Sequence, residues 1–339
     1  MTRYFEVIRR DGPARMGRLL LERQISTPGL IGGEDIISAG SVYRYGSLEE
    51  AASAALPQDS RRLAILPYIP AALDEEPSLS LPFVQIDGPK GVVIQPFSQK
   101  IPQEADVYVI ASAGVLRSGR DLVGAIARAR ERIPPDAALY APAIATPAGL
   151  GLLVYLGVDL IDTTRVMADG ILGRYHTVDG VSGAEDLSEL PCRCRHCTML
   201  SEDRSDRKSL IAHNVLKLEE ALVSVREMIR RETVREYVER QVRVSPDQTA
   251  ALRLLDQDQE YLERRTPVFR HSTLLANTAE SLHRVEVTRF ARRVLARYRP
   301  PRSDVLVLLP CSARKPYSAS RSHQLFAQAI GQSRRHLHS

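Results

Sequence analysis

Strand-like and helix-like runs alternate along residues 61–164, and this alternation restricts the fold more than any other feature of the sequence. Five short apolar runs are typical of strands: RRLAILPYI, GVVIQPF, ADVYVIAS, ALYAPA and VDLIDTT. Between them, GRDLVGAIARARERI has apolar residues at helical spacing, and TPAGLGLLVYLG is predicted to form a helix that Thr146 caps ahead of Pro147. Strands joined by helices through short connections indicate a parallel α/β sheet or barrel.

The second half of the chain is predicted to be mostly helical up to about residue 298. One long helix is expected to run to about Arg243, and Ser245 and Pro246 are predicted to cap and begin the next one. The apolar stripe of the long helix consists of Leu218, Leu222, Val225 and Ile229. YRPPRSD (298–304) is expected to be a linker, VLVLLP (305–310) a buried strand, and SHQLFAQAI the start of a helix.

Composition narrows the class of protein. A hydrophobic content of 44% and a charged content of 26% are ordinary for a globular chain, and no apolar run approaches the roughly 20 residues of a membrane span. The charged N-terminus lacks the pattern of a signal peptide, so a cytoplasmic protein without a membrane partner is expected. Residues 201–339 hold 26 Lys and Arg against 17 Asp and Glu, which favours a polyanionic partner such as nucleic acid.

Three of the four cysteines cluster in LPCRCRHCTML, as Cys192, Cys194 and Cys197. Thiolates this close can converge on one tetrahedral metal ion, which then needs a fourth ligand. His196 lies inside the run, where a strained loop would be required, whereas His213 lies on the following segment and can fold back. We therefore expect Cys192, Cys194, Cys197 and His213 to form a closed, structural zinc site.

Reactive side chains also gather in PCSARKPYSASRSH, residues 310–323. The candidates for catalysis in this stretch are Cys311, Lys315, Tyr317, Ser320 and His323. Each has a plainer interpretation as well: an inert thiol, a phosphate contact, a packing ring, a helix cap and a structural hydrogen bond, respectively.

GVDLIDTT, GRYHTVDG, the C-x-C-x-x-C run and the HN pair together resemble the C-terminal half of tRNA-guanine transglycosylases. That resemblance implies a (β/α) barrel with an inserted zinc site, exchange of a tRNA guanine for a deazaguanine base, and Asp162 as the nucleophile at the end of a barrel strand. About 160 residues precede Asp162 and no DSGGFQ-like stretch supplies a second aspartate, so a shortened barrel is expected. Asp162 can alternatively orient the end of its strand.

Pro310, Cys311, Lys315, Pro316, Tyr317, Ser320 and His323 match the P-C-x3-K-P-Y-x2-S-x2-H signature of the archaeosine synthase family, and FEVIRRDGPARMGRL and RTPVFRHSTLLANTAESLHR also resemble it. The resemblance implies an archaeal tRNA-modifying transferase. Its substrates would be lysine and tRNA carrying 7-cyano-7-deazaguanine in the D-loop, and lysine would add across the nitrile. A radical-SAM partner enzyme would then release archaeosine, and the barrel family also implies a homodimer.

The expected fold is α/β: a degenerate, shortened (β/α) TIM-type barrel with a zinc-binding subdomain, a helical connector and the start of a further α/β domain. The predicted boundaries are 1–190 for the barrel, 191–244 for the zinc subdomain and long helix, 245–300 for the connector, and 301–339 for the first part of a lysine-transfer domain. Family members usually continue into a PUA domain, so a short form, half of a split enzyme with a separate C-terminal subunit, or a truncated product is expected. Base exchange by Asp162 and a non-catalytic tRNA-binding subunit stay open as alternatives.

Overall fold

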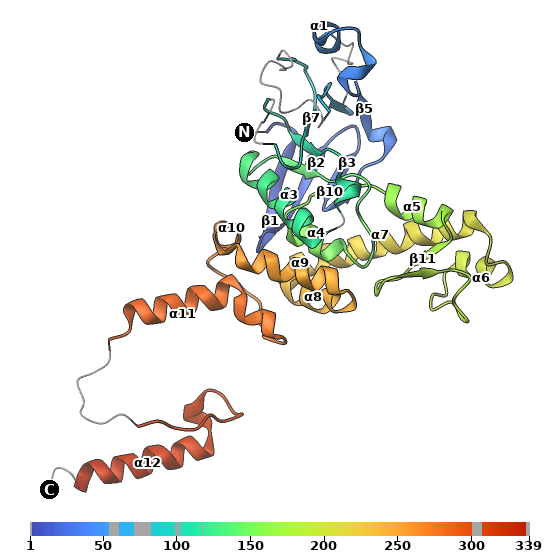
Figure 1. The fold of residues 1–339 in the computed structure, drawn as a ribbon. Helices are drawn as coiled ribbons and strands as arrows, with labels where there is room; N and C mark the ends of the chain where they lie inside the picture. Colours follow the sequence, from blue (N-terminus) through green and yellow to red (C-terminus); the bar gives the residue numbers. More distant parts are fainter. Residues whose placement is uncertain are drawn as a thin grey trace. The chain divides into compact units, whose positions relative to one another are not determined.

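The computed structural model describes residues 2–53, 61–70, 83–98, 101, 103–116, 118–299 and 307–336. The chain forms two compact units, Met1–Phe290 and Ala291–Ser339. Figure 1 shows the elements and their labels.

A seven-stranded parallel sheet lies at the centre of the first unit, in the order β4-β10-β9-β8-β7-β6-β5. Its strands are β4 (Gly29–Leu30), β5 (Ile36–Ser38), β6 (Leu63–Ile65), β7 (Lys90–Ile94), β8 (Val107–Ile110), β9 (Ala138–Tyr140) and β10 (Leu160–Ile161). The alternation in the sequence therefore predicted the parallel sheet correctly, and the five strand-like runs overlap β6 to β10, with β7 beginning one residue before its run.

The sheet must be curled, because its two edge strands are consecutive in the chain. Only six Cα steps separate Leu30 in β4 from Ile36 in β5, and they span at most about 22 Å. A flat sheet of seven strands would place its edges about 29 Å apart. The described strands thus form an open, shortened barrel, which confirms the expected fold class.

Both faces of the sheet are buried, as a parallel sheet requires. The outer face packs against α3 (Gly119–Arg132), α4 (Leu150–Tyr155) and further helices. The inner face packs against an antiparallel sheet made of β1 (Phe5–Asp11), β2 (Ala14–Leu20) and β3 (Gln24–Thr27). In the core between the two sheets, Phe5, Leu19 and Ile25 of the antiparallel sheet pack with Val107, Val109, Ala138 and Tyr140 of the parallel sheet.

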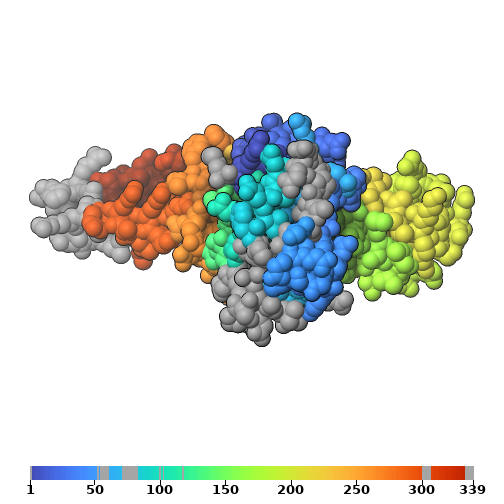
Figure 2. Space-filling view, turned by 90° about the horizontal axis from the view of Figure 1, so that it is seen from above, coloured from blue at the N-terminus to red at the C-terminus, as the bar shows by residue number. Residues whose placement is uncertain are grey.

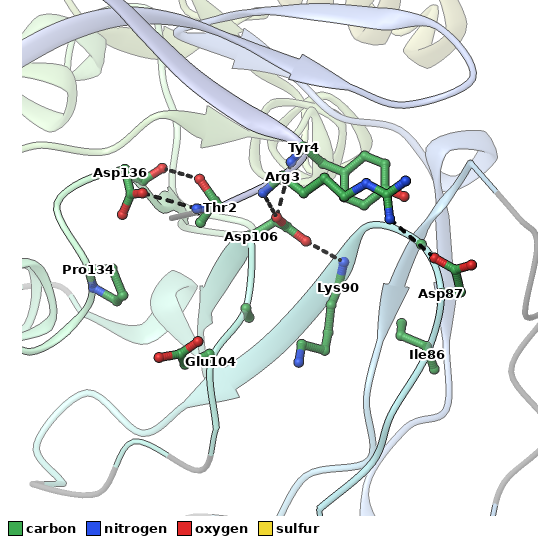
Figure 3. A pocket seen from close by; sticks show the side chains of 12 residues that line it. Thr2, Arg3, Tyr4, Ile86, Asp87, Lys90, Glu104, Asp106, Pro134 and Asp136 are labelled. Atoms are coloured by element: carbon green, nitrogen blue, oxygen red, sulfur yellow. Dashed lines mark hydrogen bonds and ion pairs between the residues drawn. The ribbon is translucent and has the colours of Figure 1, made fainter.

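Two aspartates fasten the N-terminal segment to the amino ends of the parallel strands (Figure 3). The Asp106 carboxylate accepts the backbone N–H groups of Arg3, Tyr4 and Lys90 at 3.0–3.2 Å. The Asp136 carboxylate accepts the N–H of Thr2 at 3.0 Å. Asp106 and Asp136, which line a cavity of about 370 Å³, therefore hold backbone in place, a stabilising role typical of the amino end of a barrel.

A smaller lobe follows β10 in the chain and projects from the barrel, as the yellow-green region of Figure 2 shows. It contains α5 (Thr164–Ile171), the hairpin β11 (Arg174–His176) and β12 (Val181–Gly183), α6 (Arg195–Glu202) and the first half of α7 (Arg207–Arg231). Its own core is small: Tyr175, Ala184, Leu190, Cys197, Leu200 and Leu210.

The predicted long helix to Arg243 is in fact two helices. α7 ends at Arg231, where Glu232 takes the left-handed conformation (φ 56°), and α8 covers Val234–Gln241. The N–H groups of Glu232 and Thr233 close the end of α7 on the carbonyls of Ile229 and Met228. The Glu232 carboxylate also accepts hydrogen bonds from the backbone N–H groups of His271 and Ser272, so a segment distant in the sequence stabilises this break between the helices.

The remaining helices are α1 (Leu48–Ala52), α9 (Pro246–Gln257), α10 (Gln259–Arg265), α11 (Val285–Arg297) and α12 (Arg321–His336). Short 3₁₀ turns lie at Gly33–Asp35, Val42–Arg44, Ala113–Val115, Val242–Val244, Ala279–His283 and Tyr317–Ala319. Ser245 caps α9 as predicted, by accepting the N–H of Gln248. The helix predicted from Thr146 begins later, at Leu150, because Thr146 instead closes a turn with Gly149.

The strand predicted at 305–310 is wrong over the residues that the structure describes. Residues 307–310 are exposed and form no strand, and 305–306 lie outside the described residues. A strand needs a neighbour to satisfy its backbone hydrogen bonds, and the described part of the second unit contains none. The helix predicted after it is confirmed as α12.

Candidate functional site

Three cysteines and one histidine converge in the small lobe. Cys192 and Cys194 lie in the loop before α6, Cys197 lies in its first turn, and His213 comes from α7. One ligand atom from each of these residues lies within 4.8 Å of all the others. This is the donor set and spacing of a closed tetrahedral zinc site, so the predicted residues are the ones that the fold brings together.

A backbone carbonyl orients His213. The Nε2 atom of His213 lies 2.9 Å from the carbonyl oxygen of His176, and since a carbonyl can only accept, Nε2 carries the proton. The unprotonated Nδ1 then faces the sulfurs of Cys197 at 3.2 Å and Cys194 at 3.6 Å. Burial lowers the pKa of His213 to about 4, so the ring is neutral at physiological pH. A neutral ring with its second nitrogen anchored is the form that binds a metal.

The thiols differ in their electrostatic surroundings. Burial raises the pKa of the Cys197 thiol to about 12, and its sulfur also lies 3.2 Å from the Tyr175 hydroxyl. Burial also acts against ionisation of Cys192, but the N–H of Cys194 and the ammonium of Lys217 lower the pKa of that thiol overall. A bound cation would supply the positive charge that a buried cluster of thiolates needs.

Tyr175 and Asn214 complete the site, although the sequence alone does not indicate a role for either of them. The Tyr175 ring stacks on the His213 ring at 4.0 Å between centroids. Asn214 accepts the N–H of His176 and donates to the carbonyls of Val166 and Arg174, which joins α7 to α5 and β11. Tyr175 belongs to the GRYHTVDG motif and Asn214 to the HN pair, so both motifs hold the metal ligands in place. The competing histidine, His196, is not part of the cluster.

Asp162 lies at the carboxyl end of β10, and its carboxylate is fully engaged. It accepts the Tyr140 hydroxyl at 2.7 Å, the N–H of Thr164 at 2.8 Å and the N–H of Ala143 at 3.0 Å. Burial and the nearby Asp162 charge raise the pKa of Tyr140, so this phenol stays protonated and donating. These bonds also hold Ala143 in its left-handed conformation (φ 57°). The arrangement is that of a carboxylate that orders the end of the sheet.

A cavity of about 540 Å³ opens at the carboxyl ends of the strands, where barrel enzymes bind substrates. Apolar side chains and neutral polar groups line it, among them Ile65, Tyr68, Val93, Gln95, Ser112 and Tyr140. No Asp or Glu of the described residues lines this cavity, and Asp162 lies behind Tyr140. Base exchange that uses two acidic side chains would need a carboxylate in this cavity, and the described part of the chain supplies none there.

The second unit groups four of its five candidate residues in two sets. The rings of Tyr317 and His323 stack at 4.4 Å, and the Lys315 ammonium lies 5.4 Å from the Tyr317 ring centroid. The Ser320 hydroxyl, which is buried, bonds the hydroxyls of Ser312 at 2.8 Å and Ser322 at 2.9 Å. Ser320 lies directly before α12, where its carbonyl accepts the N–H of Gln324, and its hydroxyl joins the loop to the first turn of the helix.

Cys311 is exposed, next to Ser312 of the hydroxyl chain. The Nδ1 atom of His323 is buried and makes no hydrogen bond to any described residue. Lys315, Tyr317 and His323 thus form a compact cationic and aromatic group, and Cys311 is accessible to a reactant.

Comparisons with known proteins match two parts of the chain to families. A family model described as queuine tRNA-ribosyltransferase matches residues 94–247, and one described as a domain of unknown function (DUF5591) matches residues 287–338. The first match includes Asp162 and the whole metal cluster, and the second includes the residues around Cys311.

Individual proteins that resemble this chain indicate its relationship more specifically than the family models do. The chain is 40% identical to an archaeosine synthase subunit alpha from Methanosarcina acetivorans, over 100% of this chain and 59% of the relative. It is 40% identical to an archaeosine synthase from Haloferax volcanii, over 99% of this chain and 57% of the relative. A tRNA-guanine(15) transglycosylase from Methanobrevibacter smithii is 30% identical over 66% of this chain and 35% of the relative. The chain therefore spans somewhat more than half the length of the archaeosine synthases it matches. Within the described residues, no helix combines the length and the apolar character needed to cross a membrane.

Proposed function

We propose that this chain takes part in tRNA modification in archaeosine biosynthesis. The premise is that the chain is homologous over its length to archaeosine synthases and carries a queuine tRNA-ribosyltransferase family domain. The observation that carries the proposal is the 40% identity that extends over 99–100% of the chain, beyond the segment shared with the transglycosylase family. The relatives named as transglycosylases match a smaller share of this chain, at lower identity.

The reaction that we propose is addition of lysine to the nitrile of 7-cyano-7-deazaguanine in the D-loop of tRNA. The exposed Cys311 thiol adds to the nitrile carbon, so that a C–S bond forms and the nitrile nitrogen gains a proton. An amine of lysine then attacks the same carbon, the C–S bond breaks, the thiolate leaves and regains a proton, and an amidine results. A later enzyme, such as a radical-SAM partner, would act on that product.

The other residues of this unit take supporting roles in the proposal. The Lys315 ammonium favours the Cys311 thiolate or contacts a phosphate. His323, whose Nδ1 has no hydrogen bond to a described residue, moves the proton to the nitrile nitrogen. Tyr317 stacks on His323 and supports its ring. Ser320 holds the loop that carries Cys311.

We propose that zinc at Cys192, Cys194, Cys197 and His213 is structural. Four protein ligands fill a tetrahedral ion, so no coordination position is left for a substrate. When bound, the ion supplies a crosslink between α6, its preceding loop and α7. The small core of this lobe supports that role, since such a core rarely suffices by itself.

Base exchange by Asp162 is the competing function, and the similarity to transglycosylases favours it. The hydrogen bonds of Asp162 and the absence of a described acid along the cavity count against it. A third function is that of a tRNA-binding subunit in a larger enzyme, because several relatives are named as a subunit alpha. A homodimer and a separate C-terminal subunit are compatible with either of the tRNA-modifying functions.

The test is incubation of the zinc-loaded chain with labelled lysine and tRNA that carries 7-cyano-7-deazaguanine. We expect label in this tRNA, none in tRNA with guanine at the same position, and loss of transfer in Cys311→Ala. Transfer that survives in Cys311→Ala would remove the thioimidate step. Labelled guanine exchanged into tRNA would instead support the transglycosylase. Binding of tRNA without either reaction would support the subunit.

A further inference from the structure

A cavity of about 480 Å³ lies between β1, the end of α3 and the end of α10, and its charged lining is almost entirely cationic. Four arginines line it, Arg10, Arg130, Arg264 and Arg265, against one carboxylate, Glu131. All of them belong to the first unit. Figure 1 shows α10 close to β1, although the two elements lie far apart in the sequence.

The carboxylates near this cavity leave part of the positive charge uncompensated. Glu131 pairs with Arg264, which also lies 3.7 Å from Glu260. Arg10 and Arg265 form no ion pair with any described carboxylate, and their guanidinium groups donate to backbone carbonyls. Two of those acceptors, the carbonyl oxygens of Arg130 in α3 and Tyr261 in α10, are helix carbonyls that already accept hydrogen bonds from Arg265.

A single buried carboxylate, that of Asp159, lies close to both Arg15 and Arg130 behind the cavity. Asp159 binds Arg15 through two bonds of 2.7 Å, and Nη1 of Arg130 lies 3.8 Å from the same carboxylate. Burial and the neighbouring Arg15 together lower the pKa of Arg130 to about 9, although the Asp159 charge acts in the opposite direction. Burial and Arg15 also lower the pKa of Arg10. Guanidinium groups that repel one another in a partly buried place gain most from an added anion.

We propose that this cavity, defined by Arg10, Arg130, Arg264 and Arg265, is a phosphate-binding site. Guanidinium groups match phosphate oxygens in paired hydrogen bonds, and the volume admits a phosphate with its adjoining sugar. The site as an anion pocket is independent of the reaction proposed above. Its assignment to a backbone phosphodiester of tRNA, rather than to a free phosphate ester, rests on the proposed function.

The primary variant is Arg10→Gln, because the side chain of Arg10 makes a single hydrogen bond to the described residues, a long one of 3.5 Å to the Pro135 carbonyl. Arg18→Gln is the matched control, since it removes the same charge from an exposed residue of the same antiparallel sheet, paired with Glu6. Pro267→Glu is a second variant, which adds a carboxylate at the exposed rim without removing an arginine. Arg265→Lys keeps the charge and removes the planar fork.

Binding of a fluorescent, unmodified tRNA transcript is measured by anisotropy at several salt concentrations. We expect Arg10→Gln and Pro267→Glu to weaken binding about fivefold near 0.1 M salt, and Arg10→Gln to reduce the salt slope by about one. Arg18→Gln should stay within about twofold of the parent, and Arg265→Lys should lie between the two. If Arg10→Gln lowers the melting temperature more than Arg18→Gln does, Pro267→Glu decides the result.

The second arm adds inorganic phosphate or a mononucleotide, with chloride at equal ionic strength as reference. If these raise the melting temperature of the parent but not of Arg10→Gln, while tRNA affinity is unchanged among all variants, the pocket binds phosphate and its assignment to tRNA is overturned. If both variants behave like Arg18→Gln in both arms, the phosphate site is overturned. Because the transcript carries no deazaguanine and lysine is omitted, failure of the lysine-transfer reaction leaves this result unaffected.

Discussion

At the scale of single residues, the metal site was predictable because its ligands are close in sequence. Cys192, Cys194 and Cys197 share one short run, and the choice of His213 followed from the loop that His196 would strain. Tyr175 and the His176 carbonyl could not be assigned, since their contacts with His213 come from a hairpin that only the fold brings beside α7. Residue type and spacing can predict which side chains bind a metal, whereas the groups that orient those side chains depend on tertiary structure.

The first prediction concerns the fourth metal ligand. His213→Ala should lower the zinc content of the purified chain to well below one ion per molecule and destabilise the small lobe, because both a ligand and a ring contact are lost. The control is His196→Ala, which removes a histidine only one residue from Cys197 and should keep full zinc content. Elemental analysis measures both variants, and equal zinc loss in the two would show that His213 is not the ligand.

The second prediction concerns Asp11, at the end of β1, whose carboxylate accepts the N–H of Val234 at 2.8 Å. Burial raises its pKa from 3.8 to about 6, opposed by that N–H and by Arg270, and assisted by Glu236 and Glu286. As pH rises from about 4 to 6, the unfolded chain therefore loses its proton before the folded chain does, and the stability contributed by Asp11 falls. Above pH 6 the charged, buried carboxylate costs on the order of 2 kcal/mol.

Asp11→Asn keeps an oxygen acceptor for Val234 and removes the charge. The difference in unfolding free energy between variant and parent should thus grow in favour of the variant between pH 4 and 6 and level off above pH 6. Urea unfolding at several pH values measures it. Parallel pH profiles for the two proteins would contradict the raised pKa.

At the scale of elements, periodicity identified the strands and helices but not their ends. The apolar stripe from Leu218 to Ile229 predicted α7 correctly. The break at Glu232 was missed because its cause lies about 40 residues away, in the N–H groups of His271 and Ser272. The strand expected at 305–310 failed for a related reason, since an apolar run becomes a strand only beside a partner strand.

The third prediction concerns the contact that joins α8 to α9. The buried Arg235 guanidinium binds Asp256 at 2.6 and 2.8 Å and Glu239 at 2.8 Å. Arg235→Met would leave two buried carboxylates unpaired and should lower the unfolding free energy by about 3–5 kcal/mol. Arg231→Met, which removes an exposed arginine paired with Glu227, should cost less than about 1 kcal/mol. Similar losses in urea unfolding for both variants would mean that the Arg235 contacts do not stabilise the helix pair.

For the molecule as a whole, the alternation of strands and helices predicted a parallel sheet or barrel, and the resemblance to transglycosylases implied that it is a shortened barrel. The chain before Asp162 is short, and the described sheet has seven parallel strands, open rather than closed. The pairing of β1–β3 with the inner face of this sheet could not be derived, since nothing local in residues 5–27 points to it. The cationic cavity was likewise hidden, because its arginines come from three distant segments.

The fourth prediction concerns the independence of the small lobe from the barrel. The two have separate cores, so removal of zinc by a chelator should unfold the lobe and leave the sheet intact. Hydrogen exchange should accelerate in residues 174–213 and stay slow in β7, β8 and β9. Equal loss of protection in both regions would indicate one cooperative unit.

We propose that this chain modifies the nitrile of a tRNA base and does not exchange the base. Nucleoside analysis of tRNA carrying 7-cyano-7-deazaguanine, after incubation with lysine and the parent chain or Asp162→Asn, tests it most directly. We expect a lysine adduct to replace the nitrile nucleoside with both proteins, because the Asp162 carboxylate binds Tyr140 and Ala143 at the strand end and takes no part in the proposed reaction. Release of the free base by the parent, abolished in a folded Asp162→Asn variant, would contradict it.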